Sequence, residues 1–464
     1  MVIHSMAQVS QVLENEFSFR TRKKDIETID GSEFEFFVIG GGINGAGTAN
    51  LLAQNGRKVL LVDRNDFASG TSSGSSKLIH GGLRYLANFE FMEVRRLLRE
   101  RNYLLRHTDI VKLLKFDVVV DEYSWKKITL RAGLTLYNML SGTLRIPHYH
   151  INTTKFPNHV KGYFTYDDSM TDDSLLVISN IVSAHSHGAV CLNYVEPFEL
   201  YEEHGGWKVQ LKDNISGTKF SISSKFLINA AGPWVHKVPG IGKFVDYGHL
   251  LLSKGIHVVV DSSLFPGENA VVFRSPLDKR QMFIIPRGEV IHIGTTDTFT
   301  DSPDDWAITE KDIEYVISSA KSIIPSLKRT DIIESYAGIR PLYGSGSDPG
   351  KVSRKSSVVM KSNVVSILGG KITDYRVTAQ NVARIMNRNL EPGQKLKYRG
   401  LPAIDYRRDN SDPVEQAIFH ECAINAEDIL RRRIGARLYT RDAGKSMESE
   451  VNNKVKNLIK ENYL

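Results

Sequence analysis

A short apolar run that leads into a series of glycines constrains the fold of this chain more than any other feature. Phe36 to Ile39 are all apolar, and Gly40, Gly42 and Gly45 follow within GGGINGAG. In such a series the first glycine makes a tight turn, the second lets the backbone approach a phosphate, and the third lets a helix pack on the strand. The pattern predicts a parallel α/β sheet that holds a dinucleotide pyrophosphate at a helix N-terminus.

The residues around the glycines have the order that this motif requires. The pattern predicts a buried strand at 34–39, a helix from about Gly42, and a second strand at 58–62 that is followed by Asp63. An acid at that place can accept hydrogen bonds from an adenosine ribose. An aspartate that only caps the next turn is the alternative, and the order of strand, glycine turn, helix and strand favours the ribose contact.

A second motif, SSKLIHGGLRYL at residues 75–86, combines basic and imidazole side chains with a small-residue loop. Arginine and lysine suit a phosphate or a carboxylate, and histidine can accept the proton of an alcohol because its ordinary pKa of about 6.5 lies near working pH. The candidate substrate residues are His80, Arg84, Lys254, His257, Arg340 and Lys371. Together they predict a pocket that binds an anion and accepts a proton beside a dinucleotide.

Two later segments are typical of further cofactor contacts, FLINAAGPW at 226–234 and SILGGKITDYR at 366–376. The first is a strand that ends in small residues. The second reaches a helix start through two glycines, where N–H groups can face a partly negative ring edge. The sequence holds no second glycine fingerprint, which an enzyme that exchanges hydride with NAD usually needs, so we expect the electrons to leave by another route.

The composition narrows the partners of the chain. Its 464 residues carry a formal charge of +7, which favours anionic substrates or an anionic lipid surface. No basic run is interleaved with aromatic residues, so nucleic acid is not expected. Cys191 and Cys422 have no metal-ligand spacing around them; we expect no metal site and a reducing compartment. No window approaches the ~18 apolar residues of a membrane span.

We expect a dinucleotide-binding part and a β-rich substrate part that alternate along the chain, flanked by two smaller segments. Residues 1–33 are predicted as a polar N-terminal extension that is neither a secretory signal nor a transit peptide. Residues 128–144 are apolar and too short to span a membrane, so they form either a core helix or an interfacial segment on a bilayer. The expected ranges are about 34–110, 160–235 and 335–390 for the dinucleotide-binding part, about 111–159 and 236–334 for the substrate part, and 391–464 for a short C-terminal helical domain.

Several motifs occur in an order that resembles one flavoprotein family. They are GGGINGAG, TSSGSSKLIHGGLRYL, AAGPW, SKGIHVVV, IGTTD, GIRPLYG and GGKITDYR, between about residues 35 and 387. The chain is similar to the aerobic, FAD-dependent glycerol-3-phosphate dehydrogenases, which belong to the D-amino-acid-oxidase-like flavoproteins. The resemblance implies a Rossmann-like FAD-binding domain interleaved with a β-rich substrate domain.

The resemblance also implies a reaction and its residues. The reaction is oxidation of sn-glycerol 3-phosphate to dihydroxyacetone phosphate by hydride transfer from C2 to FAD N5, with the electrons passed to a membrane quinone. The implied substrate contacts are Arg84, Tyr85, Lys254, Arg340 and Lys371. Of these, Arg84 and Arg340 would hold the phosphate or orient the glycerol hydroxyls, with Tyr85 nearby. Lys371 would stabilise negative charge on the reduced flavin and contact the substrate. His257, together with His80, would accept the alcohol proton.

On the cofactor side, the resemblance assigns small, polar and basic residues of the matched motifs to FAD. They are Gly40, Gly41, Gly42, Asn44, Gly45, Asp63, Thr71, Ser72, Ser76, Lys77, Leu78, His80, Gly81, Gly82, Ala231, Gly232, Gly370, Lys371 and Thr373.

The chain departs from the family pattern at several places. Asp374 stands where a small hydroxyl residue is common, the N-terminal extension is longer than usual, and the segment after Glu391 is shorter. The shorter segment leaves open whether the chain forms a homodimer. A peripheral membrane contact is expected through residues 128–144 or the basic C-terminal segment. The chain is expected at the cytoplasmic face of a bacterial inner membrane or in the cytoplasm.

Three alternatives to a quinone-linked dehydrogenase remain open. A glycerol-3-phosphate oxidase would use the same pocket and hand its electrons to dioxygen. An amino-acid oxidase on the same fold would need fewer cations, because its substrate carries both a carboxylate and an amine. A flavin-binding protein without this activity would keep the fold, and its flavin would not be reduced by glycerol 3-phosphate.

Overall fold

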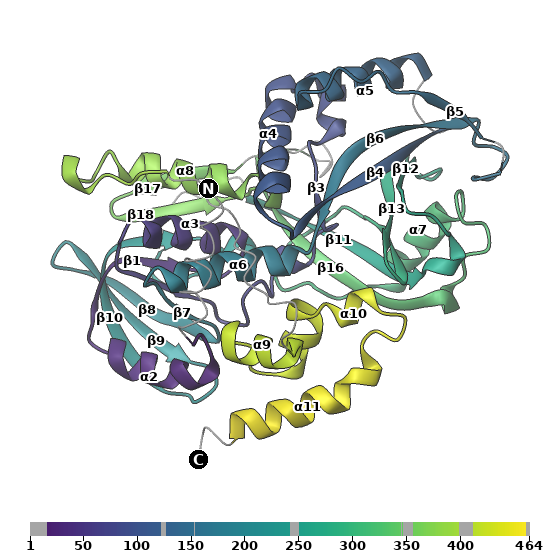
Figure 1. The fold of residues 1–464 in the computed structure, drawn as a ribbon. Helices are drawn as coiled ribbons and strands as arrows, with labels where there is room; N and C mark the ends of the chain where they lie inside the picture. The colour runs from purple at the N-terminus through teal and green to yellow at the C-terminus, as the bar shows by residue number, and fades with distance from the viewer. Residues whose placement is uncertain are drawn as a thin grey trace, which may run out of the picture.

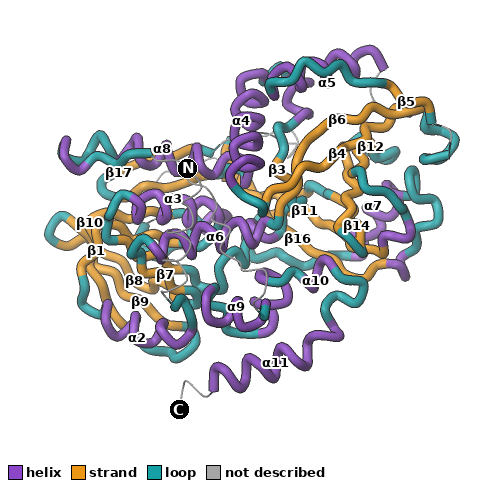
Figure 2. The backbone as a smooth tube through the Cα atoms, viewed as in Figure 1, coloured by secondary structure: helices purple, strands orange, loops and turns teal. Residues whose placement is uncertain are grey.

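The chain passes repeatedly between two β-sheets that are covered by helices (Figures 1 and 2). The computed structural model describes residues 16–121, 127–152, 154–241, 250–344, 346, 356–398 and 412–460. Within these ranges, no helix is long and apolar enough to cross a membrane. The two sheets meet near the carboxyl end of the first strand, where the predicted glycine turn lies.

The first sheet has a parallel centre in the order β18-β10-β1-β2-β7. These central strands are β1 (Glu33–Ile39), β2 (Val59–Val62), β7 (Val190–Leu192), β10 (Lys219–Asn229) and β18 (Val364–Leu368). Every residue of β2 and β18 is buried, as expected for parallel strands that are covered on both faces. The antiparallel strands of this sheet are β8 (Val195–Glu203), β9 (Gly206–Asp213) and β17 (Ser357–Lys361).

Helices cover both faces of the first sheet (Figure 1). On one face lie α3 (Ile43–Gln54), α6 (Asp173–Ser186) and α8 (Tyr375–Met386). On the other lie the β8–β9 hairpin and α2 (Phe19–Ile29). Apolar cores on both faces of the sheet therefore fix the position of β1 and of the turn that follows it.

The second sheet follows the order β15-β11-β14-β13-β12-β4-β6-β3, with β16 beside β11 and β5 beside β6. Its strands are β3 (Leu78–Ile79), β4 (Val111–Val120), β5 (Tyr149–Ile151), β6 (Gly162–Thr171), β11 (Leu250–Asp261), β12 (Ala270–Arg274), β13 (Gln281–Arg287), β14 (Val290–Gly294), β15 (Thr298–Thr300) and β16 (Ile332–Tyr343). Its helices are α4 (Phe91–His107), α5 (Lys127–Ser141) and α7 (Glu310–Ala320). The predicted fold class, a Rossmann-like part interleaved with a β-rich part, is confirmed.

Two strands lie in a different sheet from the one that the predicted ranges imply. β6 falls in a range assigned to the dinucleotide-binding part, but it pairs with β4 along its whole length. β16 falls mostly in another such range, and it pairs with β11. Both pairings are antiparallel and join segments far apart in sequence. The alternating burial of β6 suits a sheet with one open face rather than a parallel centre.

The described part of the N-terminal extension is a packed helix. Ser18 caps the N-terminus of α2, and its hydroxyl accepts hydrogen bonds from the backbone amides of Arg20 and Thr21. Its apolar side is buried against the first sheet. Arg22 is also buried, and it forms a 2.6 Å ion pair with Asp213 of β9. Part of the predicted extension is therefore a helix that belongs to the folded core. Residues 1–15 lie outside the described residues.

The C-terminal segment is helical, as expected, and it packs against both parts of the molecule (Figure 1). Its helices are α9 (Pro413–His420), the π-helix η9 (Asp428–Arg433), α10 (Ala436–Tyr439) and α11 (Lys445–Lys460). They share a small apolar core of their own. On the side of the second sheet, the imidazole of His292 lies 2.8 Å from the carbonyl oxygen of Leu438.

Candidate active site

A cavity of about 720 Å³ lies where the glycine turn of the first sheet meets the second sheet. Its volume is in the ~300–1,000 Å³ range of ligand pockets. The two predicted motifs and the later segments of the chain come together in its wall. The predicted residues that line it are Gly40, Gly42, Asn44, Asp63, Thr71, Ser72, Ser76, Leu78, His80, Gly82, Arg84, Tyr85, Ala231, Gly232, Arg340, Gly370, Lys371 and Thr373.

The glycines make the turn possible by removing side chains where backbones approach. Gly40 has a φ of +108°, and a Cβ atom there would lie 2.6 Å from the carbonyl oxygen of Ala230. A Cβ atom at Gly45 would overlap the carbonyl oxygen of Gly40. Gly42 caps α3, whose first amide, that of Ile43, donates to the Ser72 hydroxyl. The start of α3 thus faces the cavity with its backbone close to the surface.

Two of the predicted cofactor glycines support the turn from behind. Gly41 and Gly45 do not line the cavity. The Gly41 amide donates to Asp63 Oδ2 over 2.8 Å, and Asp63 Oδ1 accepts the Asn65 amide. Asp63 therefore caps the next turn as well as lining the cavity. Burial raises the pKa of its carboxyl group to about 6, although these two amides act in the opposite direction.

The cavity wall fits FAD. A buried oxygen of Asn44 (Oδ1) has no hydrogen-bond partner among the described residues, and Asn44 stands at the start of α3 in the cavity wall. Ser72 adds a hydroxyl group beside the helix N-terminus, and the Thr71 hydroxyl in the same wall donates to the Ile339 carbonyl oxygen. A helix N-terminus with close backbone and hydroxyl donors suits a pyrophosphate, and Asp63 suits a ribose. Gly370 and Lys371 bring a second glycine turn to the same cavity.

The basic end of the cavity is built around one aspartate that the sequence motifs did not single out. Asp297 accepts from Arg340 over 3.3 Å and from Arg280 over 3.2 Å. Arg340 also donates to the Thr295 hydroxyl over 2.9 Å. All four residues line the cavity. The sequence signal that could have identified Asp297 is the TTD of the IGTTD motif, since a threonine and an aspartate at these positions can orient an arginine.

A second ion-pair cluster orients Lys371. Its ammonium lies 2.6 Å from Glu93 Oε1, and Glu93 is buried on α4. Asp374, the residue that departs from the family pattern, accepts the Lys371 amide and pairs with Arg96 over 2.6 Å. Sequence reasoning missed Glu93 because it lies outside the quoted motifs, on a helix with many charged residues. The pairing of Asp374 with Arg96 gives the substitution a structural reason.

The two predicted imidazoles have different positions. His80 lines the cavity. His257 is fully buried behind the wall, where it stacks on Tyr336, and its Nε2 lies 3.0 Å from the hydroxyl of Ser76. Burial lowers the pKa of His257 well below its ordinary range, and the positive charge of Arg340 adds to the effect. His257 therefore reaches the cavity only through Ser76, contrary to the direct contact expected from the sequence.

Three further predicted residues do not line the cavity. Lys254 pairs with Asp305 over 3.2 Å and donates to a backbone carbonyl, because β11 directs it toward the segment after β15. Lys77 is buried in a 2.5 Å ion pair with Asp173 at the start of α6. The Gly81 amide donates to the Tyr137 hydroxyl. Lys254 therefore does not reach the cavity to contact a substrate, and the Lys77 ammonium does not reach it to contact the cofactor.

Comparisons with known proteins agree with this site. Residues 35–369 match the family of FAD dependent oxidoreductases. The aerobic glycerol-3-phosphate dehydrogenase of Bacillus subtilis is 34% identical over 83% of this chain and 72% of its own length. That of Staphylococcus haemolyticus is 34% identical over 80% of this chain and 70% of its length.

Solved structures extend the likeness to the whole fold. The glycerol-3-phosphate dehydrogenase from Bacillus halodurans, solved in complex with FAD, is 26% identical, with a TM-score of 0.74 over 96% of this chain and 94% of that one. The FAD-bound L-α-glycerophosphate oxidase from Mycoplasma pneumoniae has the same fold at 18% identity, with a TM-score of 0.60 over 80% of this chain and 99% of that one. The chain belongs to the FAD dependent oxidoreductases and, among them, to the family of aerobic glycerol-3-phosphate dehydrogenases.

Proposed function

We propose that this chain oxidises sn-glycerol 3-phosphate to dihydroxyacetone phosphate and passes the electrons to a membrane quinone. The observation that carries the proposal is a single cavity whose wall joins the glycine turn of a dinucleotide site to Arg340, Arg84 and Lys371. When bound, FAD supplies the acceptor for the hydride from C2 of the substrate. The protein supplies the anion site, the orientation of the alcohol and the removal of its proton.

The phosphate site is proposed at Arg340. Asp297 and Thr295 hold its guanidinium group in the cavity wall, so part of its donor fork is fixed before a ligand arrives. Arg280 shares Asp297 and places a second guanidinium beside it. Arg280 also pairs with Asp278 over 3.5 Å, so this end of the cavity holds two guanidinium groups that two carboxylates orient. Planar guanidinium groups suit a phosphate because they can donate two hydrogen bonds at once.

The amino-acid oxidase alternative is less consistent with this arrangement. An amino-acid substrate carries a carboxylate and an amine, so one anchoring cation is enough for its anion. Here Arg340, Arg280, Arg84 and Lys371 all line one cavity. The dioxygen-using oxidase shares the substrate pocket, so only the fate of the electrons separates it from the dehydrogenase.

We propose that the alcohol proton leaves through Ser76. The Ser76 hydroxyl lines the cavity and contacts His257 Nε2. In this route the substrate hydroxyl gives its proton to Ser76 Oγ while the Ser76 proton moves to His257. Burial and the charge of Arg340 lower the pKa of His257, which favours the neutral imidazole before transfer and also makes it a weaker base. His80, which lines the cavity directly, is the alternative acceptor.

The membrane contact is proposed at the α5 surface, which we define as the exposed side of α5 together with the segment that follows it. Leu130, Leu134 and Tyr137 are buried, so one side of α5 is a core helix. The opposite side is exposed and apolar at several positions, and its neighbours are basic. The exposed apolar residues are Ile128, Met139, Leu144, Ile146 and Ile151, and the basic ones are Lys127, Arg131 and Arg145.

Such a surface suits the headgroup region of an anionic bilayer, where apolar side chains insert and basic ones remain at the phosphates. Ile128 and Leu144 have 84% and 88% of their surface exposed, which is unfavourable in water unless something covers them. A quinone acceptor resides in the bilayer, so the same contact would bring the site to its oxidant. We propose the cytoplasmic face of a bacterial inner membrane as the place of this contact.

Replacing Arg340 by alanine should separate the phosphate from the rest of the substrate. A desolvated charged contact is worth about 2–5 kcal/mol, so kcat/KM for sn-glycerol 3-phosphate should fall by about 30-fold or more. The value for free glycerol should change little. Arg329→Ala, which removes an exposed arginine paired with Glu310, is the matched control and should change neither value. An equal fall for both substrates in Arg340→Ala would refute the phosphate assignment.

Ser76→Ala tests the proton route. If Ser76 relays the proton, Ser76→Ala and His257→Asn should each lower kcat/KM by roughly 10²-fold, and the double variant should be no worse than either single one. FAD content, measured by absorbance, shows whether cofactor loss contributes. A large loss in His80→Asn with normal activity in Ser76→Ala would assign the proton to His80 instead.

Anionic phospholipid vesicles that contain ubiquinone test the membrane contact. Ile128→Asp combined with Leu144→Asp should reduce vesicle binding at least about tenfold, since each buried apolar side chain contributes about 1.5–3 kcal/mol. Quinone reduction should fall with it, while reduction of a soluble dye should not. Ile215→Asp with Val359→Asp is the control, because Ile215, in the turn between β9 and β10, and Val359, on β17, are less exposed apolar residues. Unchanged binding of the first pair would exclude the α5 surface.

A further inference from the structure

The loop that follows β2 has two sides. Most of its residues line the cofactor cavity, from Asp63 to Asn65 and from Ser69 to Ser72. Asp66, between these two stretches, does not line the cavity, and it is buried with 1% of its surface exposed. We call residues 63–72 the Asp63 loop. Its cavity side faces the cofactor site, and its other side is held by the contacts of Asp66.

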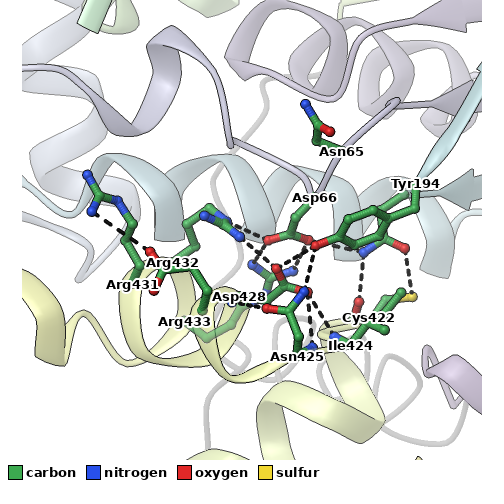
Figure 3. Close-up of polar contacts among 12 residues, drawn as sticks. Asn65, Asp66, Tyr194, Cys422, Ile424, Asn425, Asp428, Arg431, Arg432 and Arg433 are labelled. Atoms are coloured by element: carbon green, nitrogen blue, oxygen red, sulfur yellow. Dashed lines mark hydrogen bonds and ion pairs between the residues drawn. The ribbon is translucent and has the colours of Figure 1, made fainter. Parts of the chain in front are cut away.

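Two consecutive arginines of the C-terminal segment form hydrogen bonds with Asp66 (Figure 3). Its Oδ2 accepts from Arg432 Nε over 2.6 Å and from Arg433 Nη1 over 2.9 Å. Its Oδ1 accepts from Arg433 Nη2 over 2.9 Å and from the Asn193 amide over 3.0 Å. The Arg433 contact is bidentate, which fixes the direction as well as the position of the carboxylate.

The arginines are themselves held by the C-terminal segment and by the connection between β7 and β8. Arg432 pairs with Asp428 over 2.6 Å, and Asp428 accepts from the Tyr194 hydroxyl over 2.7 Å. Arg433 donates to the carbonyl oxygen of Glu421. Asp66, Asp428 and Arg433 are almost completely buried. Burial by itself would raise the pKa of Asp66, but Arg433 and Arg432 outweigh it and hold that pKa well below its ordinary range.

Contacts within the Asp63 loop connect Asp66 to the glycine turn. Phe67, the residue after Asp66, packs closely against Gly41. A Cβ atom added to Gly41 would lie 2.6 Å from the Phe67 ring. The next amide, that of Ala68, donates to the Gly41 carbonyl oxygen over 3.1 Å. Gly41 in turn donates to Asp63. Contacts therefore run without interruption from Arg433 to the carboxylate that faces the ribose site.

We propose that the C-terminal helical segment is a positioning element for FAD, which acts by holding the Asp63 loop in its cofactor-binding form through Asp66. Arg432 and Arg433 do not line the cavity, so they are positioning residues. The proposal rests on FAD as the cofactor and on no assumption about the substrate. Because coupling between two sites is reciprocal, FAD must also tighten the docking of residues 412–460.

The test compares two arginines of the same segment. Arg433→Met removes the bidentate contact with Asp66. Arg437→Met is the matched control, because Arg437 pairs with Glu427 and Glu448 inside the C-terminal segment. FAD affinity of the apoprotein is measured by quenching of flavin fluorescence. We expect Arg433→Met to weaken FAD binding at least tenfold and Arg437→Met to change it by less than threefold.

Two further readouts separate positioning from general stability. In the wild-type chain, FAD should slow amide hydrogen exchange in residues 412–460, and this slowing should be absent in Arg433→Met. Asp66→Asn, which keeps the shape of the side chain, serves if Arg433→Met does not fold, and it should weaken FAD binding in the same way. Wild-type FAD affinity in both Asp66→Asn and Arg433→Met, or no effect of FAD on exchange in the wild type, would overturn the proposal. Loss of glycerol 3-phosphate oxidation with normal FAD coupling would count against the proposed function alone.

Discussion

The structure depends on the close approach of two backbone segments at the first turn. α3 can begin directly after β1 only because Gly45 has no side chain to collide with the carbonyl oxygen of Gly40. Gly40 itself passes within contact distance of Ala230, which draws the end of β10 to the same point. The turn therefore brings three backbone segments together and leaves the N-terminus of α3 facing the cavity. The second sheet, the Asp63 loop and Lys371 are all arranged around that point.

Paired charges are the second organising feature. Arg340 is balanced by Asp297, Lys371 by Glu93 and Lys77 by Asp173. Each of these three cations thus has an acid that fixes its direction and offsets the cost of removing it from water. Arg280 and Arg340 are both oriented by Asp297, which places two guanidinium groups at one end of the cavity for an anionic substrate.

The sequence was sufficient for whatever depends on neighbours along the chain. The glycine turn, the acid after β2 and the fold class follow from local pattern, and the cofactor and family follow from the order of the motifs. The sequence did not show which side chains a distant strand would cover. His257 lies behind Ser76, and Lys254 pairs with Asp305, because their positions are set by the pairing of β11 with β14 and β16. Glu93 belongs to a helix whose charges give no sign of which face is buried.

The C-terminal segment illustrates the same limit. Its helical character was predictable from composition, but the contact of Arg432 and Arg433 with Asp66 joins residues more than three hundred positions apart. Such a contact leaves no local pattern in the sequence. Because of this contact, we infer that the C-terminal segment supports the cofactor site in addition to covering the sheets.

Anaerobic reduction of the bound flavin tests the central claim most directly. The FAD-loaded protein is mixed without oxygen with sn-glycerol 3-phosphate, glycerol or glycine, and the flavin absorbance near 450 nm is followed. The account predicts rapid bleaching by sn-glycerol 3-phosphate, much slower bleaching by glycerol, and none by glycine. A flavin that sn-glycerol 3-phosphate leaves oxidised, or that glycine reduces faster, would contradict it.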